Sequence, residues 1–364
     1  MRLSPSAIEP GSSFAEALLV WYKQSARSFL WRQETPNPYH VWLSEMMLQQ
    51  TTTQTVTPYF EAFTKRWGSF QHLSQASLSD VLQQWQGLGY YRRAENVWRC
   101  AKEVATNHQG VLPQEVNALL KLPGIGPYTA AAISTIAFEK SAVAVDGNIA
   151  RVFSRLLCLK ESATDLLKVV RLEAKSFLPQ DSVLKNKSFP RPYGDYTQAL
   201  MDLGASICTP QAPKCLLCPV RSFCKAARLG TQGEFPRKKE KKAQPHRYGA
   251  FFFVVCKKDG TFLMQKEQNA LLKGLWRPLT SAWGAQKQEW TPPLASTWQN
   301  IGTVQHVFTH FKLCLELFYT QVPDKNVSHE GTWVSLADLE DYPVSTLVKK
   351  ALKCYKGFVS PKAA

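Results

Sequence analysis

The sequence predicts a mainly helical N-terminal part followed by a smaller α+β domain, and two observations support this. Up to about residue 227, apolar residues recur at mixed spacings of three and four, as in Val81, Leu82 and Trp85, which is the period of a helix. Beyond residue 247, short runs rich in Phe, Val and Thr replace this pattern, and Asp259-Gly260 is a hairpin-like turn between two of them. Such a change of period separates two folded domains.

The expected elements follow that division. Helical patterns cover residues 41–63, 77–88 and 149–157, and strand-like runs cover 250–256, 261–265, 312–319 and 331–334. Residues 230–247 are charged, contain Pro and are poor in apolar residues, so we expect a solvated linker. Its basic run at 237–242 could instead be a localisation signal or a phosphate contact. The expected organisation is a domain at 1–229, the linker at 230–247, a domain at 248–356 and a tail at 357–364.

The charge balance favours a polyanionic partner. The 364 residues include 44 Lys and Arg against 28 Asp and Glu, a formal charge of +16, and cations that neutralise phosphates release condensed counterions. Charge alone does not distinguish a nucleic acid from a membrane surface. The longest apolar run, 250–256, is far shorter than a spanning helix, so we expect no transmembrane segment. Nine cysteines cannot all pair, and the N-terminus has no secretion signal, so we expect a reducing cytoplasm.

Four cysteines, Cys208, Cys215, Cys218 and Cys224, form a C-x6-C-x2-C-x5-C loop. Four thiolates so close in sequence can surround one metal centre, either a [4Fe–4S] cluster or tetrahedral zinc. Zinc modules more often use two C-x2-C pairs with a longer spacer, and this loop has a single such pair, which favours iron–sulfur. The alternative is a set of buried free thiols. We expect a structural rather than a redox-catalytic centre, because no other feature indicates an electron carrier.

A glycine-containing segment, LPGIGPYTA at 122–130, lies between two helical patterns. Gly124 and Gly126 permit a tight turn whose backbone N–H groups face outward at the start of the next helix. Such a turn binds an anion without sequence preference. A GxG turn alone is usually only a helix connection. Here it shares a chain with the charge surplus and the cysteine loop, which favours a phosphate contact.

Two carboxylates are candidates for acid–base chemistry. Glu45 lies in VWLSEMML, an otherwise apolar helix, where burial should raise its pKa toward that of a general acid. The alternative is a position on the one solvated edge of that helix. Asp146 opens a helix, so by position it is most often only an N-cap. Cleavage of a glycosidic bond nevertheless requires such a pair, because one acid protonates the leaving group while a carboxylate stabilises the oxocarbenium ion.

Several segments together resemble a known family. PYHVWLSEMMLQQT, GLGYYRRAENV, LPGIGPYTAAAI and AVDGNIARV, with the cysteine loop, closely resemble the adenine DNA glycosylases of the MutY family. That family belongs to the helix-hairpin-helix superfamily, which includes endonuclease III. The resemblance covers about residues 25–228 densely. It implies a helix-hairpin-helix glycosylase fold with an iron–sulfur cluster loop, joined to a Nudix-like C-terminal domain.

Three observations favour the adenine branch of the superfamily. Bifunctional relatives carry a Lys after the hairpin that forms a Schiff base with the sugar, and Tyr128 stands there in this chain, which implies a monofunctional hydrolase. Glu45 matches the acid position of the family, which endonuclease III-like enzymes lack. The extra C-terminal domain matches the Nudix-like fold with which the family recognises the partner base.

The resemblance implies that the substrate is adenine mispaired with 8-oxoguanine or guanine in double-stranded DNA, flipped out of the stack before cleavage. Glu45 matches the acid that protonates adenine N7. Asp146 matches the carboxylate that stabilises or captures C1′, assisted by Tyr128 and Asn148. The resemblance also implies a [4Fe–4S] cofactor. We further expect a monomer with no membrane partner, located in the cytoplasm and associated with the nucleoid through DNA.

Other site positions are assigned by the same resemblance. Trp31, Arg32 and Gln198 match the adenine pocket; Gln50, Tyr90, Gly124 and Gly126 match DNA contacts; Phe308, Thr309 and His310 match the loop that recognises 8-oxoguanine. The ordinary alternatives are a core position for Tyr90 and a surface cation at Arg32.

The chain departs from the family pattern in a few places. Thr309 replaces the usual Ser and keeps the hydroxyl, whereas Arg277 replaces an acidic residue and Leu30 replaces a Pro. No Glu-rich Nudix box is present, so we expect no phosphohydrolase activity from the C-terminal domain.

Two other functions remain open on the sequence. A related iron–sulfur glycosylase could act on thymine in a T:G mismatch or on an oxidised pyrimidine, and duplexes with different mispairs distinguish it from an adenine glycosylase. A non-enzymatic iron–sulfur DNA-binding protein would keep the charge, the hairpin and the cluster. It would leave the acid at Glu45 unexplained.

Overall fold

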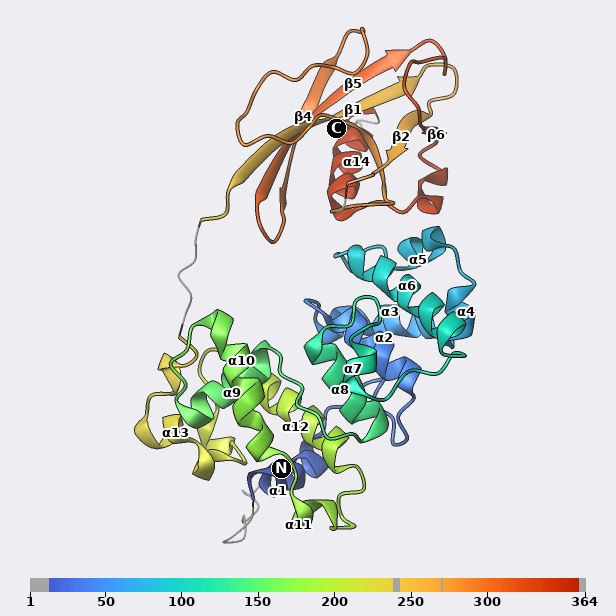
Figure 1. Cartoon of the computed structure of the whole chain (residues 1–364). Coiled ribbons are helices and arrows are strands. Elements are labelled where there is room, and N and C mark those ends of the chain that lie inside the picture. Colours follow the sequence, from blue (N-terminus) through green and yellow to red (C-terminus); the bar gives the residue numbers. More distant parts are fainter. Residues whose placement is uncertain (1–12, 238–242, 270, 360–364) are drawn as a thin grey trace. The chain divides into compact units, whose positions relative to one another are not determined.

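The computed structural model describes residues 13–237, 243–269 and 271–359. The chain divides into two compact units. The first runs to Gln75 and resumes over Arg99–Glu240, and the second comprises Ala76–Trp98 and the chain from Lys241. The first unit is helical and the second contains a sheet (Figure 1), which confirms the predicted mainly helical part and smaller α+β part. Most of the basic run, 238–242, lies outside the described residues.

The first unit consists of helices joined by short connections. Its helices are α1 (Phe14–Ser25), α2 (Pro38–Leu48), α3 (Thr53–Arg66), α4 (Phe70–Ser74), α7 (Val116–Leu119), α8 (Pro127–Phe138), α9 (Gly147–Leu157), α10 (Ala163–Glu173), α11 (Asp181–Leu184), α12 (Pro192–Ser206) and α13 (Lys225–Leu229). Helix α5 (Leu78–Gln84) lies in the second unit, and α6 (Arg92–Asn107) begins there and ends in the first. None of the described helices is both long and apolar enough to cross a bilayer.

The helical pattern predicted at 41–63 forms two helices rather than one. Gln50 has a φ of 57°, in the left-handed region, which ends α2. The side chain of Thr52 then accepts the backbone N–H of Thr55 and caps α3. Asn37 caps the start of α2 in the same way by accepting the N–H of Tyr39 at 2.9 Å. The prediction missed the break because QQTT contains no Gly or Pro.

Helix α12 is central to the first unit, since it packs against α1, α8 and α9. Glu139, directly after α8, accepts the backbone N–H groups of Tyr193 and Gly194 at 3.0 Å each. These N–H groups belong to the first turn of α12 and have no partner within the helix. Arg191 donates to the carbonyl of Ile136 at 2.6 Å and completes the connection. The two helices are therefore joined end to end by polar contacts.

We expect Gly194→Ala to destabilise the first unit. A Cβ at position 194 would collide with Oε1 of Glu139 and lie 3.2 Å from the carbonyl oxygen of Thr135. Overpacking of this kind costs ~1–3 kcal/mol. Urea denaturation followed by helical circular dichroism measures the loss. Gly233→Ala is the control, because a Cβ there meets no atom within 4 Å; equal midpoints for the two variants would contradict the expectation.

Among the described residues, the second unit contains a six-stranded sheet in the order β4-β5-β1-β3-β2-β6. Its strands are β1 (His246–Cys256), β2 (Phe262–Lys266), β3 (Trp276–Thr280), β4 (Gln299–Val307), β5 (Lys312–Val322) and β6 (Thr332–Val334). β1 and β5 pair in parallel from His246↔Lys312 to Cys256↔Val322, and the other pairs are antiparallel. Helix α14 (Thr346–Val359) packs on the sheet, where Tyr355 stacks on Phe253 with ring centroids 4.8 Å apart.

The four predicted strands are confirmed within a few residues, and β3, β4 and α14 were missed. Gly260, with a φ of 69°, forms the predicted turn between β1 and β2. β3 contains Pro278, which argues against a strand when read from sequence. β4 is interrupted by an irregularity between Asn300 and Gly302 and is mostly exposed, so it lacks the apolar alternation that marks a strand.

Arg277, which departs from the family pattern, forms a buried ion pair. Its Nε donates to Oε2 of Glu267 at 2.6 Å, and the two side chains are 13% and 6% exposed. Burial raises the pKa of Glu267, but the hydrogen bonds from Arg277 and from the backbone of Asn269 outweigh it, so the pKa lies below its usual value. The pair connects β3 to the end of β2, which gives Arg277 a structural role in this sheet.

Candidate active site

Glu45 is buried within helix α2. Its exposed fraction is 7%, and Leu43, Met46 and Met47 beside it are fully buried. Burial raises the pKa of Glu45 to about 7. The expected elevation is therefore confirmed, and the alternative of a solvated edge is wrong. A carboxyl with this pKa holds a proton near neutral pH and can donate it.

Three further groups act on Glu45. A hydrogen bond with Tyr128, in the first turn of α8, lowers its pKa; the charge of Asp146, directly before α9, raises it; the charge of Arg32 lowers it. Burial and the charges of Glu45 and Asp146 raise the pKa of Tyr128 well above its usual value, so this phenol remains protonated. Residues far apart in sequence thus act on the same carboxyl group.

Asp146 is both a helix cap and a neighbour of the acid. Its Oδ1 accepts the backbone N–H of Ile149 at 2.7 Å, which caps α9, and its Oδ2 accepts Nδ2 of Asn148 at 2.9 Å. Arg151 donates in turn to Oδ1 of Asn148 at 3.1 Å and to the carbonyl of Gly204 at 2.7 Å. The N-cap interpretation of Asp146 is therefore confirmed, and its role in glycosidic cleavage stays a prediction. The contacts hold the carboxylate in one orientation.

The residues assigned to the adenine pocket are largely buried. Trp31 is 7% exposed and stacks on Phe29 with ring centroids 4.9 Å apart, and Gln198 on α12 is 5% exposed. Arg32 forms a two-point ion pair with Asp202, so the alternative of a surface cation is wrong.

The predicted hairpin joins α7 to α8. Gly124 has a φ of 77°, which favours glycine, and Gly126 is the N-cap of α8. No side chain among the described residues caps this helix end, so its first N–H groups can donate hydrogen bonds to an anion. Gln50 is exposed in the turn before α3. Nothing in this geometry conflicts with a phosphate contact at the hairpin.

Tyr90 lies in the second unit and is exposed. It is 46% exposed, so the alternative of a core position is wrong. Its φ is 49°, and the guanidinium of Arg93 lies 5.4 Å from its ring centroid. Its hydroxyl is 3.0 Å from Oγ1 of Thr309 in the same unit. Tyr90 and Thr309, which the resemblance assigns to DNA contacts and to 8-oxoguanine recognition, are therefore direct neighbours.

An aromatic cluster supports the loop at 308–310. Phe308 is half-buried and packs against Phe311 and Trp283, with ring centroids 4.8 Å and 6.0 Å away. Thr309 and His310 beside it are exposed. The loop thus presents a hydroxyl and an imidazole from an apolar base.

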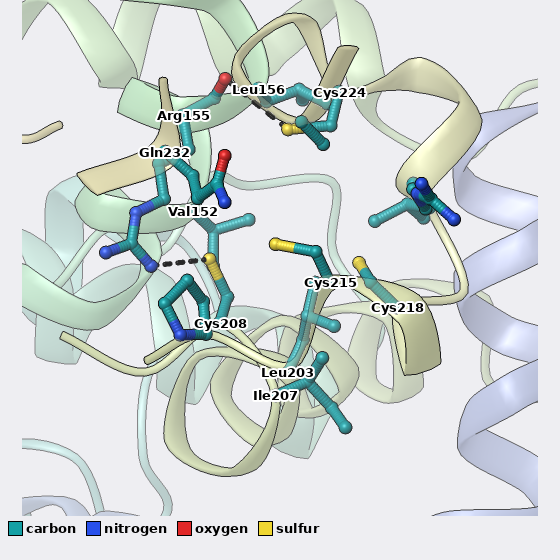
Figure 2. A pocket seen from close by; sticks show the side chains of 14 residues that line it. Val152, Arg155, Leu156, Leu203, Ile207, Cys208, Cys215, Cys218, Cys224 and Gln232 are labelled. Atoms are coloured by element: carbon teal, nitrogen blue, oxygen red, sulfur yellow. Dashed lines mark hydrogen bonds between the residues drawn. The ribbon is translucent and has the colours of Figure 1, made fainter. Parts of the chain in front are cut away.

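The four cysteines of the predicted loop line one small pocket, together with Val152, Leu203 and Arg155 (Figure 2). Burial, together with the charges of Cys208, Cys224 and Cys215, raises the pKa of Cys218 to about 12. Four thiolates can therefore coexist here only with compensating positive charge.

Four cysteines that line one pocket are the donor set that a [4Fe–4S] cluster takes. In a four-iron cluster each thiolate binds a different iron, so the sulfurs stand further apart than the ligands of one zinc. Arg155 donates from Nη1 to Sγ of Cys208 at 3.3 Å. The residues fit a [4Fe–4S] group.

Sequence reasoning missed three residues that organise the site: Asp202, Arg151 and Arg155. All three are buried and charged. Their partners lie between 53 and 175 residues away, apart from the contact of Arg151 with Asn148. The one available signal was a charged residue within an otherwise apolar stretch of helix, as for Glu45.

The fold and the acid–carboxylate pair define the class of this protein. Residues 43–179 match the model of the HhH-GPD superfamily base excision DNA repair protein, and residues 250–354 match the NUDIX domain. A solved thermostable thymine-DNA glycosylase is similar, with 28% identity, a TM-score of 0.51, and 59% of this chain and 95% of that chain covered. The chain is a helix-hairpin-helix glycosylase of base-excision repair with a C-terminal Nudix domain.

Similar proteins identify the branch of the helix-hairpin-helix superfamily to which the chain belongs. The chain is 31% identical to the adenine DNA glycosylase of Homo sapiens, covering 95% of this chain and 74% of that protein. It is 29% identical to the adenine DNA glycosylase of Buchnera aphidicola, covering 94% of this chain and 97% of that protein. The chain belongs to the adenine DNA glycosylase family.

We expect base excision to be lost as pH rises through about 7, the pKa of Glu45, because the acid form is the proton donor. On the alkaline limb of the pH–rate profile, above about pH 7, single-turnover rates should fall ~tenfold per pH unit. Glu45→Gln should abolish this limb and reduce excision by at least ~10²-fold while DNA affinity survives. Glu61→Gln, on the exposed surface of α3, is the control.

The same variant has an expected effect on stability. A carboxyl whose folded pKa is raised from 4.5 to about 7 contributes stability below 4.5, and this is lost as pH rises through 7. Glu45→Gln should therefore be more resistant to urea than the parent chain at pH ~8. A Glu45→Gln variant that is less stable than the parent chain at pH ~8 would contradict the assignment of Glu45 as a buried acid.

Proposed function

We propose that this chain hydrolyses the N-glycosidic bond of adenine opposite 8-oxoguanine or guanine in double-stranded DNA. The observation that carries the proposal is the buried acid Glu45 beside the ordered carboxylate of Asp146. This is the pair of roles that glycosidic cleavage requires. The family membership supports adenine as the base, and the loop at 308–310 supports recognition of the opposite base.

The proposed reaction begins with adenine flipped into the pocket of Trp31, Arg32 and Gln198. Glu45 gives its proton to N7, and the C1′–N9 bond breaks with both electrons leaving on the base. Asp146 stabilises or captures the cationic sugar, while Asn148 holds the carboxylate in place. Water then adds to C1′ and gives its proton to a carboxylate, which leaves an abasic site.

The proposed enzyme is a monofunctional hydrolase. Tyr128 occupies the position after the hairpin, where bifunctional relatives carry the lysine that forms a Schiff base. Its phenol has no amine nitrogen, and it keeps its proton. Its hydroxyl orients Glu45 instead. Strand cleavage at the abasic site is therefore left to alkali or to another enzyme.

DNA contacts are proposed for both units. The uncapped end of α8 at Gly124 and Gly126 suits a phosphate, and Gln50 is exposed near the start of α3. In the second unit, Tyr90 is the proposed wedge, and Phe308, Thr309 and His310 are proposed to recognise 8-oxoguanine. We propose that the enzyme acts as a monomer in the cytoplasm, associated with the nucleoid.

We also propose that Cys208, Cys215, Cys218 and Cys224 hold a [4Fe–4S] cluster. When bound, such a group neutralises the four thiolates and fixes the loop after α12. The loop carries Lys214, Arg221 and Lys225, so ordering it presents cations toward a phosphate backbone.

A panel of duplexes tests the substrate. We expect release of adenine from A:8-oxoguanine and A:G duplexes, with strand breaks appearing only after alkali. T:G duplexes and oxidised pyrimidines should remain uncut. Release of thymine without release of adenine would favour the alternative that resembles the thymine-DNA glycosylase. Breaks without alkali would contradict the monofunctional assignment.

Metal analysis tests the cluster. We expect four iron and four sulfide per chain, whereas one zinc per chain would reject the cluster. Cys215→Ser should lose the iron and weaken binding to undamaged duplex. Cys158→Ser is the matched control, since Cys158 is a half-buried cysteine outside the pocket.

A further inference from the structure

Asp202 is a buried carboxylate that pairs with two arginines. It lies on α12 with an exposed fraction of 1%. Arg32 donates from Nη1 to Oδ2 at 2.8 Å and from Nη2 to Oδ1 at 2.9 Å. Arg27 donates from its backbone N to Oδ2 at 3.0 Å and from Nε to Oδ1 at 2.8 Å. A carboxylate with these contacts has no freedom to rotate.

The two arginines differ in what surrounds them. The side chain of Arg27 is 34% exposed and can reach water, whereas that of Arg32 is 12% exposed. Arg32 also donates to the carbonyl of Arg27 at 3.2 Å and lies over the rings of Tyr22 and Phe29. The guanidinium of Arg32 is therefore confined and cannot relax into solvent if it loses its anion.

Arg32 has other acidic groups nearby. The charges of Asp202, Tyr22 and Glu45 act on it, and Arg32 itself acts on Asp195, a half-buried carboxyl in the first turn of α12. Glu45 in turn is acted on by Tyr128, Asp146 and Arg32. An Arg32 released from Asp202 would have Glu45 and Asp195 as its remaining carboxyl partners. An ion pair with Glu45 would hold that carboxyl in the ionised form, which cannot donate a proton.

We propose that Asp202 is a positioning residue of the excision reaction: it holds Arg32 in a fixed two-point pair and so prevents that cation from forming an ion pair with the acid Glu45. Asp202 contacts neither the base nor the sugar in this role. The proposal rests on the assignment of Glu45 as the acid. It gives the buried pair a function beyond the packing of α12.

The test is the pH dependence of single-turnover adenine release by the full chain. In Asp202→Asn, the amide offers N–H groups to the arginines and cannot keep both two-point contacts. We expect the alkaline limb to move to lower pH by about one unit. Excision should then be ~tenfold slower than the parent at pH 8 and within about threefold of it at pH ~5.5, where Glu45 stays protonated in both.

Arg27→Gln is the matched control. It removes a similar number of hydrogen bonds from Asp202 and leaves the pair with Arg32 intact, so the limb should not move. Arg32→Gln in the Asp202→Asn background removes the released cation and should return the limb to the parent position or above, whatever the maximal rate. Asp202→Glu, which keeps the charge, should move it less than Asp202→Asn does.

Folding is monitored by helical circular dichroism and iron content. If Asp202→Asn does not fold, the double variant Asp202→Asn/Arg27→Gln replaces it, because only one unpaired guanidinium then remains. The same displacement is expected. A uniform loss of rate with an unmoved limb would overturn the proposal and leave Asp202 as a packing residue. Excision by Glu45→Gln at the parental rate would instead overturn the assignment of the acid itself.

Discussion

The burial of one carboxyl group is the constraint on which the site depends. Glu45 lies within a helix whose other residues pack into the core, so its proton is retained at a pH where a solvated glutamate has lost it. In the proposed reaction, Glu45 can donate its proton only if no cation forms an ion pair with it and if an anion lies nearby to stabilise the sugar. We propose that Asp202 meets the first condition by pairing with Arg32, and that Asp146 meets the second. The three carboxylates therefore have different environments and different roles.

Part of the positive charge of the chain is buried and serves to hold the fold together. Arg151 and Arg155 are 8% and 2% exposed and donate to backbone carbonyls around the cysteine loop, including those of Gly204 and Thr209. They hold α9 against the cysteine loop rather than attract a polyanion. The surplus of +16 counts these residues together with surface cations. The attraction for phosphate must therefore come from the exposed lysines and arginines.

The features that could be predicted from sequence are those encoded within a few residues. An acid in an apolar run, an aspartate before a helix and a four-cysteine spacing are all local patterns, and the structure places each as the pattern indicates. The role of Asp202 could not be predicted, because its partner Arg32 is 170 residues away and neither segment contains a pattern that indicates the pairing. β3 and β4 were missed because their order depends on the neighbouring strands rather than on their own apolar alternation.

The double duty of Asp146 limits how this position can vary. Its carboxylate accepts the N–H of Ile149 and so starts α9, the helix that also carries Arg151 toward the cysteine loop. Replacement by an apolar residue removes a helix cap worth ~1 kcal/mol together with the anion. Asparagine and serine keep the cap nearly unchanged while they remove the charge. These exchanges separate the chemistry of this segment from its folding, whereas an apolar side chain changes both.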